Sequence, residues 1–598
     1  MNFKEAFRTL RFKGRTPGNN QLYTQWGEQL DPEHVLEDYP RPQLKRNNCT
    51  ILNGYWNYSI TKQATRPEQF EGTILVPFSP ESVLSGVNRQ LKPKEYLWYQ
   101  RIFWIDEKWK NKRCILHFGA VDQYCEVYIN GQLAGDHMGG YLPFSMDITD
   151  KLKGVENDLC VKVADESDTS YHSRGKQKLN RGGMFYTAQS GIWQTVWMEW
   201  VPDLYITSLQ ITPDVEAGVV HVAVFVNDDF QRDRIFDIVL KAEILDEQNI
   251  VSSIENNTQF ITIPLKSFVY WSPEMPKLYG LIITVGEDRI ESYFAMRKVE
   301  IKTGQDGIPR IYLNHEPYFQ NGLLDQGYWP DGLYTAPSDD AMIYDIMKAR
   351  ELGFHMLRKH IKIEPLRWYY HCDRLGMLVW QDMVNGGEKY HLWLVGYLPT
   401  IFPGIASKIK DHHYRLFGRA NVQGRKEWLR ECRDTIALLY NQPSIIVWVP
   451  FNEGWGQFDA RKAYELIQEL DTTRLIDHAS GWFDQNCGDF ESIHNYFHPM
   501  RAAIKKRPFV LSEYGGYACY IKQHSFSEEI YGYRIYLSSE ELNKAYHHLL
   551  ERDIGDLRDA GLSAGVYTQL SDVEDEVNGL LTYDRKICKV TPVKIQEK

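Results

Sequence analysis

Late in the chain the sequence reads Ile445-Ile-Val-Trp-Val-Pro-Phe-Asn-Glu453, a run of apolar, strand-forming residues that ends in an amide and a carboxylate. A second stretch, Pro508-Phe-Val-Leu-Ser-Glu513, has the same form. Continuous apolar runs of this length are typical of parallel strands that are buried on both faces. The two stretches therefore predict buried parallel strands, each with a carboxylate at its end.

Further strand-like runs flank these two, and stretches of helical periodicity alternate with them. The eight candidate strands are residues 318–324, 354–358, 377–381, 445–451, 474–478, 492–496, 509–512 and 565–569. Candidate helices are 338–352, 364–375, 425–440, 460–470 and 538–560, with none expected between the fifth and sixth strands. Eight parallel strands in about 250 to 300 residues are the specification of a TIM barrel. Residues 304–598 are therefore predicted to form one.

The preceding part of the chain has a different pattern, in which short β-rich runs alternate with turn signals. In Cys125-Glu-Val-Tyr-Ile-Asn-Gly131, for example, apolar residues alternate with others and Asn-Gly marks a hairpin turn. Residues 1–201 are predicted to form an antiparallel sandwich. Residues 202–303 have the size of a second, immunoglobulin-like sandwich.

Composition narrows the class of partner. The chain has 598 residues, 43% of them hydrophobic, and a net charge of -11, which argues against nucleic acid or an acidic membrane surface as a partner. No stretch reaches about 18 uncharged apolar residues, and no apolar run follows the basic start as it would in a signal peptide. The nine cysteines show no metal-ligand spacing. We expect a cytoplasmic protein with reduced thiols and a small neutral ligand.

Catalytic groups in a TIM barrel lie at the carboxyl ends of the strands. Polar residues follow the candidate strands at this end: Asp325, Gln326, Arg358, His360, Asp382, Asn452, Glu453, Asp477, His478, His494, Tyr496, Glu513, Tyr514, Gln569 and Asp572. A single carboxylate at a strand end more often makes a salt bridge or caps a helix. Two carboxylates, on the fourth and seventh strands, favour a catalytic pair.

A pair of carboxylates that flanks a bond is what glycoside cleavage requires. One group, with a raised pKa, protonates the leaving oxygen, and the other stays ionised. Their separation decides the stereochemistry, because a retaining pair stands about 5 to 5.5 Å apart and an inverting pair about 6.5 to 9.5 Å.

Several motifs resemble those of glycoside hydrolase family 2, the family of β-galactosidases, β-glucuronidases and β-mannosidases. They are Pro40-Arg-Pro-Gln-Leu44, Leu52-Asn-Gly-Tyr-Trp56, Leu116-His-Phe-Gly-Ala-Val-Asp122, Gly191-Ile-Trp-Gln-Thr-Val-Trp197 and Trp271-Ser-Pro-Glu-Met-Pro-Lys-Leu-Tyr279. The resemblance covers nearly the whole chain. It implies a multidomain fold with a sugar-binding β-sandwich (jelly roll), an immunoglobulin-like β-sandwich and a catalytic (β/α)8 TIM barrel.

The resemblance also implies roles for site residues. It makes Glu453 the acid/base, Asn452 a donor to the sugar 2-hydroxyl and Glu513 the nucleophile. Arg358 and His360 match a substrate-side strand end of the family, and Tyr496 matches a tyrosine that points at the nucleophile. Asp382, His494 and Gln569 are further candidate substrate-binding residues because of their position at strand ends. An alternative for Arg358 is a buried ion pair that holds Glu513 in place, and His360 and His494 could instead be core histidines.

Departures from the family pattern bear on the substrate. β-Glucuronidases of the family bind the sugar carboxylate with an Asn-x-Lys pair, whereas the matching stretch here reads Glu576-Val-Asn578. An acid at this place favours a neutral sugar, so we expect a retaining exo-β-galactosidase. The stretch Gln381-Asp-Met-Val-Asn-Gly-Gly387 lacks the Glu/His cluster of the magnesium-dependent members, so neither metal nor cofactor is expected.

Several alternatives stay open. Within the class these are an arabinosidase, a mannosidase, or a β-glucuronidase that uses Arg358 or Lys359 for the carboxylate. Outside it they are a non-catalytic glycan-binding protein and an unrelated barrel enzyme such as an aldolase. The oligomeric state is open, as is whether residues 384–413 form a loop over the active site.

Overall fold

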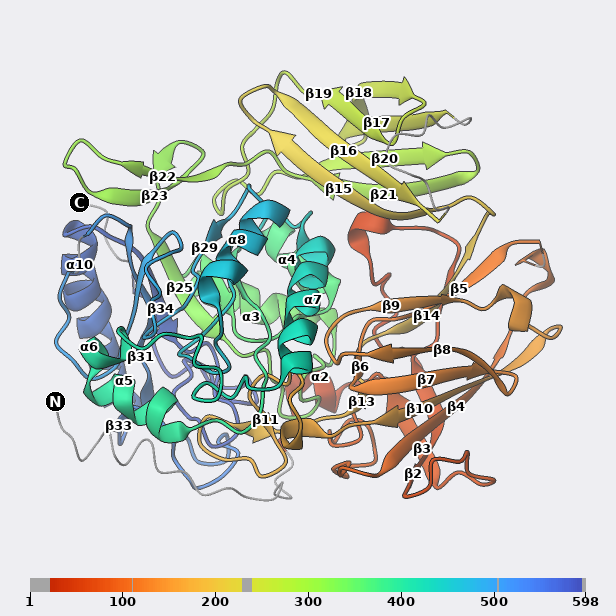
Figure 1. The fold of residues 1–598 in the computed structure, drawn as a ribbon, viewed down its shortest axis with the longest axis horizontal. Helices are drawn as coiled ribbons and strands as arrows, with labels where there is room; N and C mark the ends of the chain where they lie inside the picture. The colour runs from red at the N-terminus through yellow and green to blue at the C-terminus, as the bar shows by residue number, and fades with distance from the viewer. Residues whose placement is uncertain (1–21, 110, 228–238, 503–504, 594–598) are drawn as a thin grey trace.

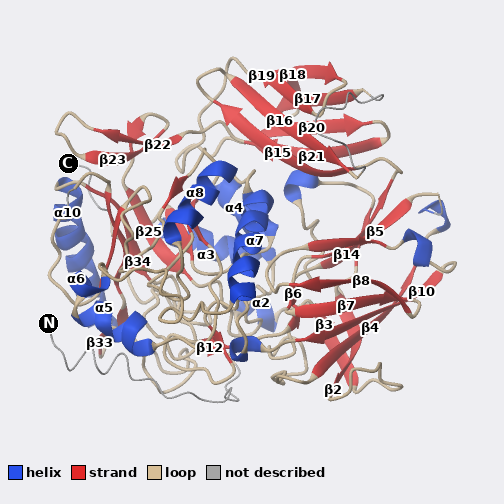
Figure 2. Cartoon of the chain, in the orientation of Figure 1, coloured by secondary structure: helices blue, strands red, loops and turns tan. Residues whose placement is uncertain are grey.

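The computed structural model describes residues 22–109, 111–227, 239–502 and 505–593. In Figure 1 a β-sandwich formed by the early part of the chain lies to the right, a second sandwich lies above, and a barrel with its helices lies to the left. Figure 2 shows that most helices gather around the barrel. The basic start of the chain lies outside the described residues.

The first sandwich is a jelly roll of two main antiparallel sheets. Its four-stranded sheet has the order β1 (Cys49–Ile51), β14 (Val196–Val201), β5 (Arg113–Phe118) and β9 (Phe144–Asp147). Its six-stranded sheet has the order β3 (Gly72–Val76), β2 (Gly54–Thr61), β4 (Tyr96–Trp104), β10 (Glu156–Ala164), β7 (Tyr124–Ile129) and β8 (Gln132–Met138). The predicted hairpin turn is confirmed, because Asn130 and Gly131 join β7 to β8 with φ of 52° and 77°.

Short elements complete this part. Two small ribbons pair β13 (Gly191–Ile192) with β6 (Val121–Asp122) and β11 (Gln177–Lys178) with β12 (Tyr186–Thr187). The helical turns are α2 (Gln25–Glu28), η1 (Pro42–Leu44), η2 (Glu107–Trp109), η3 (Thr149–Lys151) and η4 (Ser167–Thr169).

The second sandwich is immunoglobulin-like. One sheet has the order β15 (Ile206–Asp214), β16 (Val219–Val226) and β19 (Phe260–Pro264), and the other β18 (Asn249–Asn256), β17 (Leu240–Asp246), β20 (Tyr279–Val285) and β21 (Asp288–Phe294). A small sheet of β22 (Val299–Thr303), β23 (Pro309–Leu313) and β24 (Glu316–Pro317) leads to the barrel. This sheet contains strands from both sides of the predicted domain boundary between residues 303 and 304. The position of that boundary therefore stays a prediction.

All eight predicted barrel strands are present and pair in parallel. In chain order they are β25 (Gln320–Asp325), β26 (Met356–Lys359), β27 (Leu378–Asp382), β28 (Ile445–Val449), β29 (Leu475–Ile476), β30 (Glu491–Asn495), β31 (Phe509–Gly515) and β34 (Leu562–Thr568). The sheet order places the first strand beside the eighth. Because the first strand pairs with the eighth, the sheet curls round and the carboxyl ends of its strands gather at one face.

The ladder is open between β29 and β30, where no helix was expected. Side-chain contacts cross this gap instead: the amide of Ile476 donates to Asp489 Oδ2 at 2.7 Å, and Ser492 Oγ donates to Asp477 Oδ2 at 2.7 Å. The irregular unit follows from the two-residue length of β29, which leaves little backbone to pair.

The predicted helices are confirmed with small shifts of their ends. They are α3 (Asp339–Glu351), α4 (Leu366–Leu375), α7 (Val422–Leu439), α8 (Ala460–Leu470), and α9 (Ser539–His548), which continues through a π-helical turn, η6 (Leu549–Ile554), into α10 (Gly555–Asp559). Ser338 caps α3 by accepting from the amide of Ala341. Two short strands, β32 (Tyr517–Cys519) and β33 (Arg534–Tyr536), form a separate ribbon.

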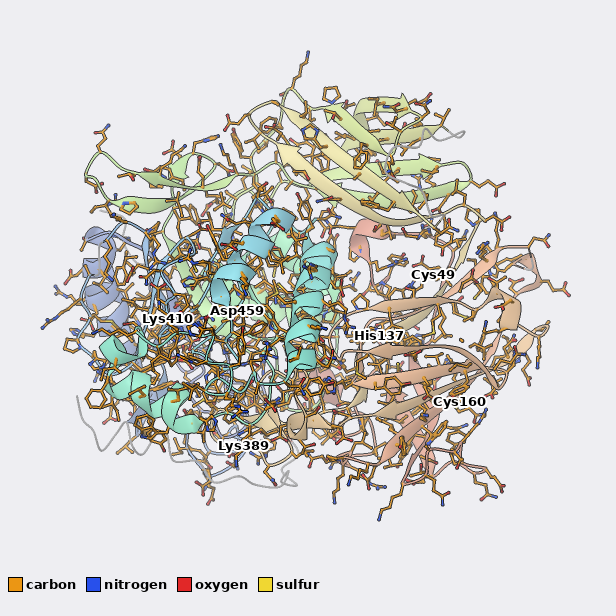
Figure 3. All side chains as sticks on the ribbon, viewed as in Figure 1. Cys49, His137, Cys160, Lys389, Lys410 and Asp459 are labelled. Atoms are coloured by element: carbon orange, nitrogen blue, oxygen red, sulfur yellow. The ribbon has the colours of Figure 1, made fainter. Side chains whose placement is uncertain are left out.

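All nine cysteines lie in the described part of the chain and are free thiols, as expected. Cys49 and Cys160, labelled in Figure 3, belong to different sheets of the jelly roll. Among the described residues, no helix is long and apolar enough to cross a membrane.

Arg46 joins the two sandwiches through buried charges. Its Nη1 donates to Glu199 Oε2 in β14 at 2.9 Å, and its Nε donates to Asp288 Oδ1 in β21 at 2.9 Å. The three side chains are 5%, 1% and 4% exposed. Removing one member of such a group leaves the others buried without full compensation.

We therefore expect Arg46→Met to lower the free energy of unfolding by about 3 to 5 kcal/mol. Calorimetric unfolding of the full chain would measure this as a lower transition temperature. The control is Arg289→Met, because Arg289 pairs with Glu291 at the surface and should contribute less than about 1 kcal/mol. An equal loss in both variants would contradict the prediction.

Candidate active site

Glu453 lies just beyond β28, where the chain turns sharply. Asn452 forms a bridge with Ser480, and the amide of Glu453 donates to the carbonyl of Ser480 at 2.9 Å. The φ of Glu453 is 52°, a left-handed conformation that non-glycine residues seldom adopt. These backbone contacts hold the Glu453 carboxylate, which is 14% exposed, at the carboxyl end of the barrel.

Glu513 lies within β31 and is 5% exposed. Arg358 Nη1 donates to its Oε1 at 3.2 Å, and the Tyr496 hydroxyl donates to its Oε2. Tyr496 is held in turn by Thr568 Oγ1 at 3.0 Å and by stacking on Tyr533, with ring centroids 3.6 Å apart. The Glu513 carboxylate is thus oriented by donors on both oxygens.

The tertiary fold brings these two carboxylates together. One oxygen of Glu453, one of Glu513 and a ring nitrogen of His494 all lie within 4.8 Å of one another. His494 Nδ1 is 2.7 Å from Glu453 Oε1, and His494 Nε2 is 3.6 Å from Glu513 Oε1. The two groups are therefore close enough to act on the same bond.

Arg358 is completely buried, and its guanidinium group bonds to several side chains of the site. It donates to Asp382 from Nε at 2.9 Å and to the side-chain oxygen of Asn452 at 2.9 Å, besides its contact with Glu513. The expected alternative for this residue, a buried ion pair with Glu513, is present in the structure. Arg358 links three barrel strands and orients Asn452.

His360 and Asp382 form a second buried pair. His360 Nδ1 lies 2.7 Å from Asp382 Oδ2, while His360 Nε2 is buried without a partner among the described residues. Burial and the charge of Lys176 lower the pKa of His360 well below its usual value, so the ring is neutral. A neutral ring that donates from Nδ1 to the carboxylate presents Nε2 as an acceptor.

The pKa of Glu453 differs from the raised value expected of an acid. Burial raises the pKa of this carboxyl, but the hydrogen bonds from His494 and Trp455 and the charge of Lys176 outweigh burial and place it below the ordinary value. Trp455 Nε1 donates to Glu453 Oε2 at 3.1 Å. The sequence pattern did not single out Trp455, although it follows Glu453 by only two residues.

Gln569 is fully buried and engaged by other amides. Its Nε2 donates to Asn578 Oδ1 at 2.8 Å, and its Oε1 accepts from Gln326 at 2.8 Å. Asn578 also donates to Glu576 Oε1 at 2.9 Å. The predicted substrate contact of Gln569 stays a prediction, because these contacts place the residue in a supporting network.

Residues 384–413 pack beside Glu453. The segment contains η5 (Trp393–Tyr397), a π-helical turn, with α5 (Leu398–Ile401) and α6 (Pro403–Ala406). The ring of Tyr390 lies 5.2 Å from that of Trp455. Tyr390 also lines a cavity of about 600 Å³ whose other wall comes from the jelly roll, including Ser170 and Tyr171. The segment thus contacts Trp455, a neighbour of Glu453, and its role as a loop over the active site stays a prediction.

Glu453, His494 and Glu513 also have the composition of a metal site. Both ring nitrogens of His494 already have partners, however, since Nδ1 contacts Glu453 and Nε2 contacts Ser480 Oγ at 2.8 Å. A metal at this imidazole would have to displace one of them. The expectation that no metal is required stays a prediction.

Comparison with known proteins matches three successive family models. They are described as the sugar-binding domain of glycosyl hydrolases family 2 (residues 81–202), glycosyl hydrolases family 2 (residues 204–297), and the TIM barrel domain of the same family (residues 335–521).

Among curated relatives, a β-galactosidase of Thermoanaerobacter pseudethanolicus is 25% identical over 63% of this chain and 47% of its own length. A putative β-glucuronidase of Formosa agariphila is 26% identical over 60% of this chain and 39% of its own length. The chain thus spans about half the length, or less, of these relatives.

The solved structures that resemble the chain include two β-glucuronidases. One, from an uncultured Clostridium species, has a TM-score of 0.69 and 18% identity over 92% of this chain and 97% of its own. The other, from Dictyoglomus thermophilum, has a TM-score of 0.70 and 17% identity over 93% of this chain and 97% of its own. At this identity the likeness concerns the fold.

Proposed function

The chain belongs to glycoside hydrolase family 2, and we propose that it is an exo-acting retaining β-glycosidase whose preferred substrates end in galactose. The observation that carries this proposal is the approach of the Glu453 and Glu513 carboxylates, with oxygens within 4.8 Å. An inverting enzyme needs room for a water, with carboxyl groups about 6.5 to 9.5 Å apart. The spacing here favours direct attack by a carboxylate.

The proposed reaction has two steps. Glu513 attacks the anomeric carbon while the bond to the leaving oxygen breaks, and Glu453 gives its proton to that oxygen. In the second step water attacks the glycosyl-enzyme, Glu453 takes a proton from the water, and Glu513 leaves as the carboxylate. His494 Nδ1 lies 2.7 Å from Glu453 Oε1, so the imidazole can hold the Glu453 carboxyl in place in both steps.

The surrounding residues support these roles. The donors from Arg358 and Tyr496 hold the Glu513 carboxylate in one orientation. The side-chain oxygen of Asn452 accepts from Arg358, which leaves the NH2 group of Asn452 without an acceptor among the described residues. This group is suited to donate to a sugar hydroxyl, a contact that strengthens in the transition state.

The choice of a neutral sugar rests on charges near Glu576. A glucuronide would bring its carboxylate toward this acid. The barrel cations considered for a glucuronidase are engaged elsewhere, since Arg358 pairs with Asp382, and Lys359 Nζ donates to Asp325 and Glu364 at 2.6 and 2.7 Å. We therefore favour galactosides over glucuronides.

A panel of p-nitrophenyl galactoside, glucuronide, mannoside and arabinoside, assayed with EDTA, tests the proposal. We expect the galactoside to be cleaved fastest, and NMR of the first product to show retained configuration. Cleavage of the glucuronide alone would contradict the choice of sugar. An inverted product would contradict the mechanism, and no cleavage would favour a glycan-binding role.

We expect Trp455→Phe to shift the alkaline limb of kcat/KM to higher pH. The change removes an N–H donor that stabilises ionised Glu453, so the pKa of Glu453 rises and its acid form persists to higher pH. The ring contacts with Phe185 and Tyr390 can be kept by phenylalanine. A shift to lower pH would show that Trp455 does not act on Glu453 in this way.

A further inference from the structure

A ribbon of the jelly roll reaches into the barrel site. The strands β11 and β12 pair in parallel, and the amide of Tyr186 donates to the carbonyl of Lys176, just before β11, at 3.0 Å. Side chains alternate along such a ribbon. Gln177 donates to Tyr141 at 2.9 Å, within the cluster of side chains that packs around the barrel, so Lys176 is directed to the other side.

The barrel holds the backbone around Lys176 firmly. The amides of Arg174 and Gly175 donate to the carbonyl of Asn385, beyond β27, at 2.9 and 3.0 Å. A Cβ atom on Gly175 would lie 3.0 Å from the carbonyl oxygen of Ile361, beyond β26. The base of Lys176 is therefore fixed at the carboxyl ends of the second and third barrel strands, next to His360.

The ammonium group of Lys176 has no carboxylate partner in the described part of the chain. The side chain is half-buried, and its Nζ lies 5.8 Å from the centre of the Tyr186 ring. The hydroxyl of that same tyrosine donates to Glu576 Oε2. Lys176 and Glu576 thus both contact Tyr186, one at its ring and the other at its hydroxyl.

The charge of Lys176 affects the pKa of three groups of the site. It lowers the pKa of His360, second only to burial, and it contributes to the lowered pKa of Glu453. Burial raises the pKa of Glu576, and Lys176 is the largest effect that opposes burial. Within the described residues Lys176 has no ion-pair partner, and its backbone is held beside His360, so its ammonium group is placed to meet a bound sugar.

We propose that Lys176 binds the terminal sugar, and that Lys176 and Glu576 together determine whether a neutral or a negatively charged sugar is accepted. This inference rests on the proposed glycosidase function. The ammonium group donates to a sugar hydroxyl, and Glu576 accepts from a neighbouring one, which suits a neutral glycone. Glu576 supplies a negative charge near Lys176, so it repels the carboxylate of a uronate sugar. Without the charge of Glu576, Lys176 could pair with that carboxylate.

The test compares kcat/KM for p-nitrophenyl galactoside and glucuronide in four proteins: wild type, Lys176→Met, Glu576→Gln and the double variant. Lys176→Met should lower galactoside cleavage about tenfold or more. Glu576→Gln should raise the glucuronide-to-galactoside ratio at least about tenfold, and adding Lys176→Met should remove that gain. Lys176→Arg should retain part of the activity.

Lys108→Met is the control, because it removes an exposed cation of the jelly roll that pairs with Asp106, and it should leave the substrate ratio within about twofold. Unfolding temperatures identify any variant that fails to fold. A gain that survives in the double variant, or full galactoside activity in Lys176→Met, would overturn the inference.

Failure of the proposed function can be told apart from failure of this inference. Calorimetric binding of galactose and glucuronic acid to the same four proteins requires no turnover. If wild type cleaves neither glycoside, loss of sugar affinity in Lys176→Met still supports the inference, and unchanged affinity refutes it. If wild type prefers the glucuronide, the inference is overturned, because Glu576 then does not exclude a uronate carboxylate.

Discussion

Glu513→Gln is expected to lower kcat at least about 10³-fold for every glycoside that the protein cleaves. An amide at this position cannot attack the anomeric carbon, so no glycosyl-enzyme forms. The substitution preserves the shape of the side chain, and Arg358 can still donate to the amide oxygen. Sugar binding should therefore remain while turnover is lost.

Intact-mass measurement gives an independent reading of the same step. A fluoro-sugar with an activated leaving group should add one glycosyl unit to wild type, with the label on the peptide that contains Glu513. Glu491→Gln is the control, because Glu491 begins β30 at the opposite end of the barrel and pairs with Lys505 and Arg507. Normal turnover by Glu513→Gln would refute the nucleophile assignment.

Glu453→Gln is expected to separate substrates by their leaving groups. A glycoside with a poor leaving group, such as a methyl glycoside, needs a proton on the departing oxygen and should lose about 10² to 10⁴ in kcat/KM. A dinitrophenyl glycoside departs without a proton, so its kcat/KM should fall far less. Its kcat should fall because the second step lacks a base.

Steady-state kinetics across a series of aryl galactosides would measure this dependence. The slope of log kcat/KM against leaving-group acidity should be steeper in Glu453→Gln than in wild type. Trp455→Phe is the matched comparison, because it keeps the carboxylate and removes only one of its donors. Equal losses on good and poor leaving groups would contradict the assignment of Glu453 as acid.

Much of the barrel could be predicted from local pattern. Strands such as 445–451 are continuous apolar runs, and helix 338–352 is bounded by a serine cap and a glycine, so each signal lies within a few residues. Parallel pairing then places the strand ends at one face. Glu453 and Glu513 stand out by this position alone, since each carboxylate directly follows a continuous apolar strand.

The tertiary structure decided what depends on contacts between distant segments. The pKa of Glu453 is lowered because His494, on another strand, donates to it. Gln569 follows a strand as predicted, yet two neighbouring amides engage it. Neither outcome has a local signal, because each depends on which side chains the fold brings within hydrogen-bond reach.

The sequence by itself determined the architecture and the family and pointed to the two carboxylates, because apolar periodicity and strand-end position are properties of short segments. Only the tertiary structure decided the charge around the sugar site. In the sequence Arg358 and Lys359 look available to bind a sugar carboxylate, but buried acids neutralise both in the fold. Lys176 belongs to a different domain and lies about 280 residues before Glu453 in the chain. Charge acts through space, so a cation's availability depends on its neighbours in the fold.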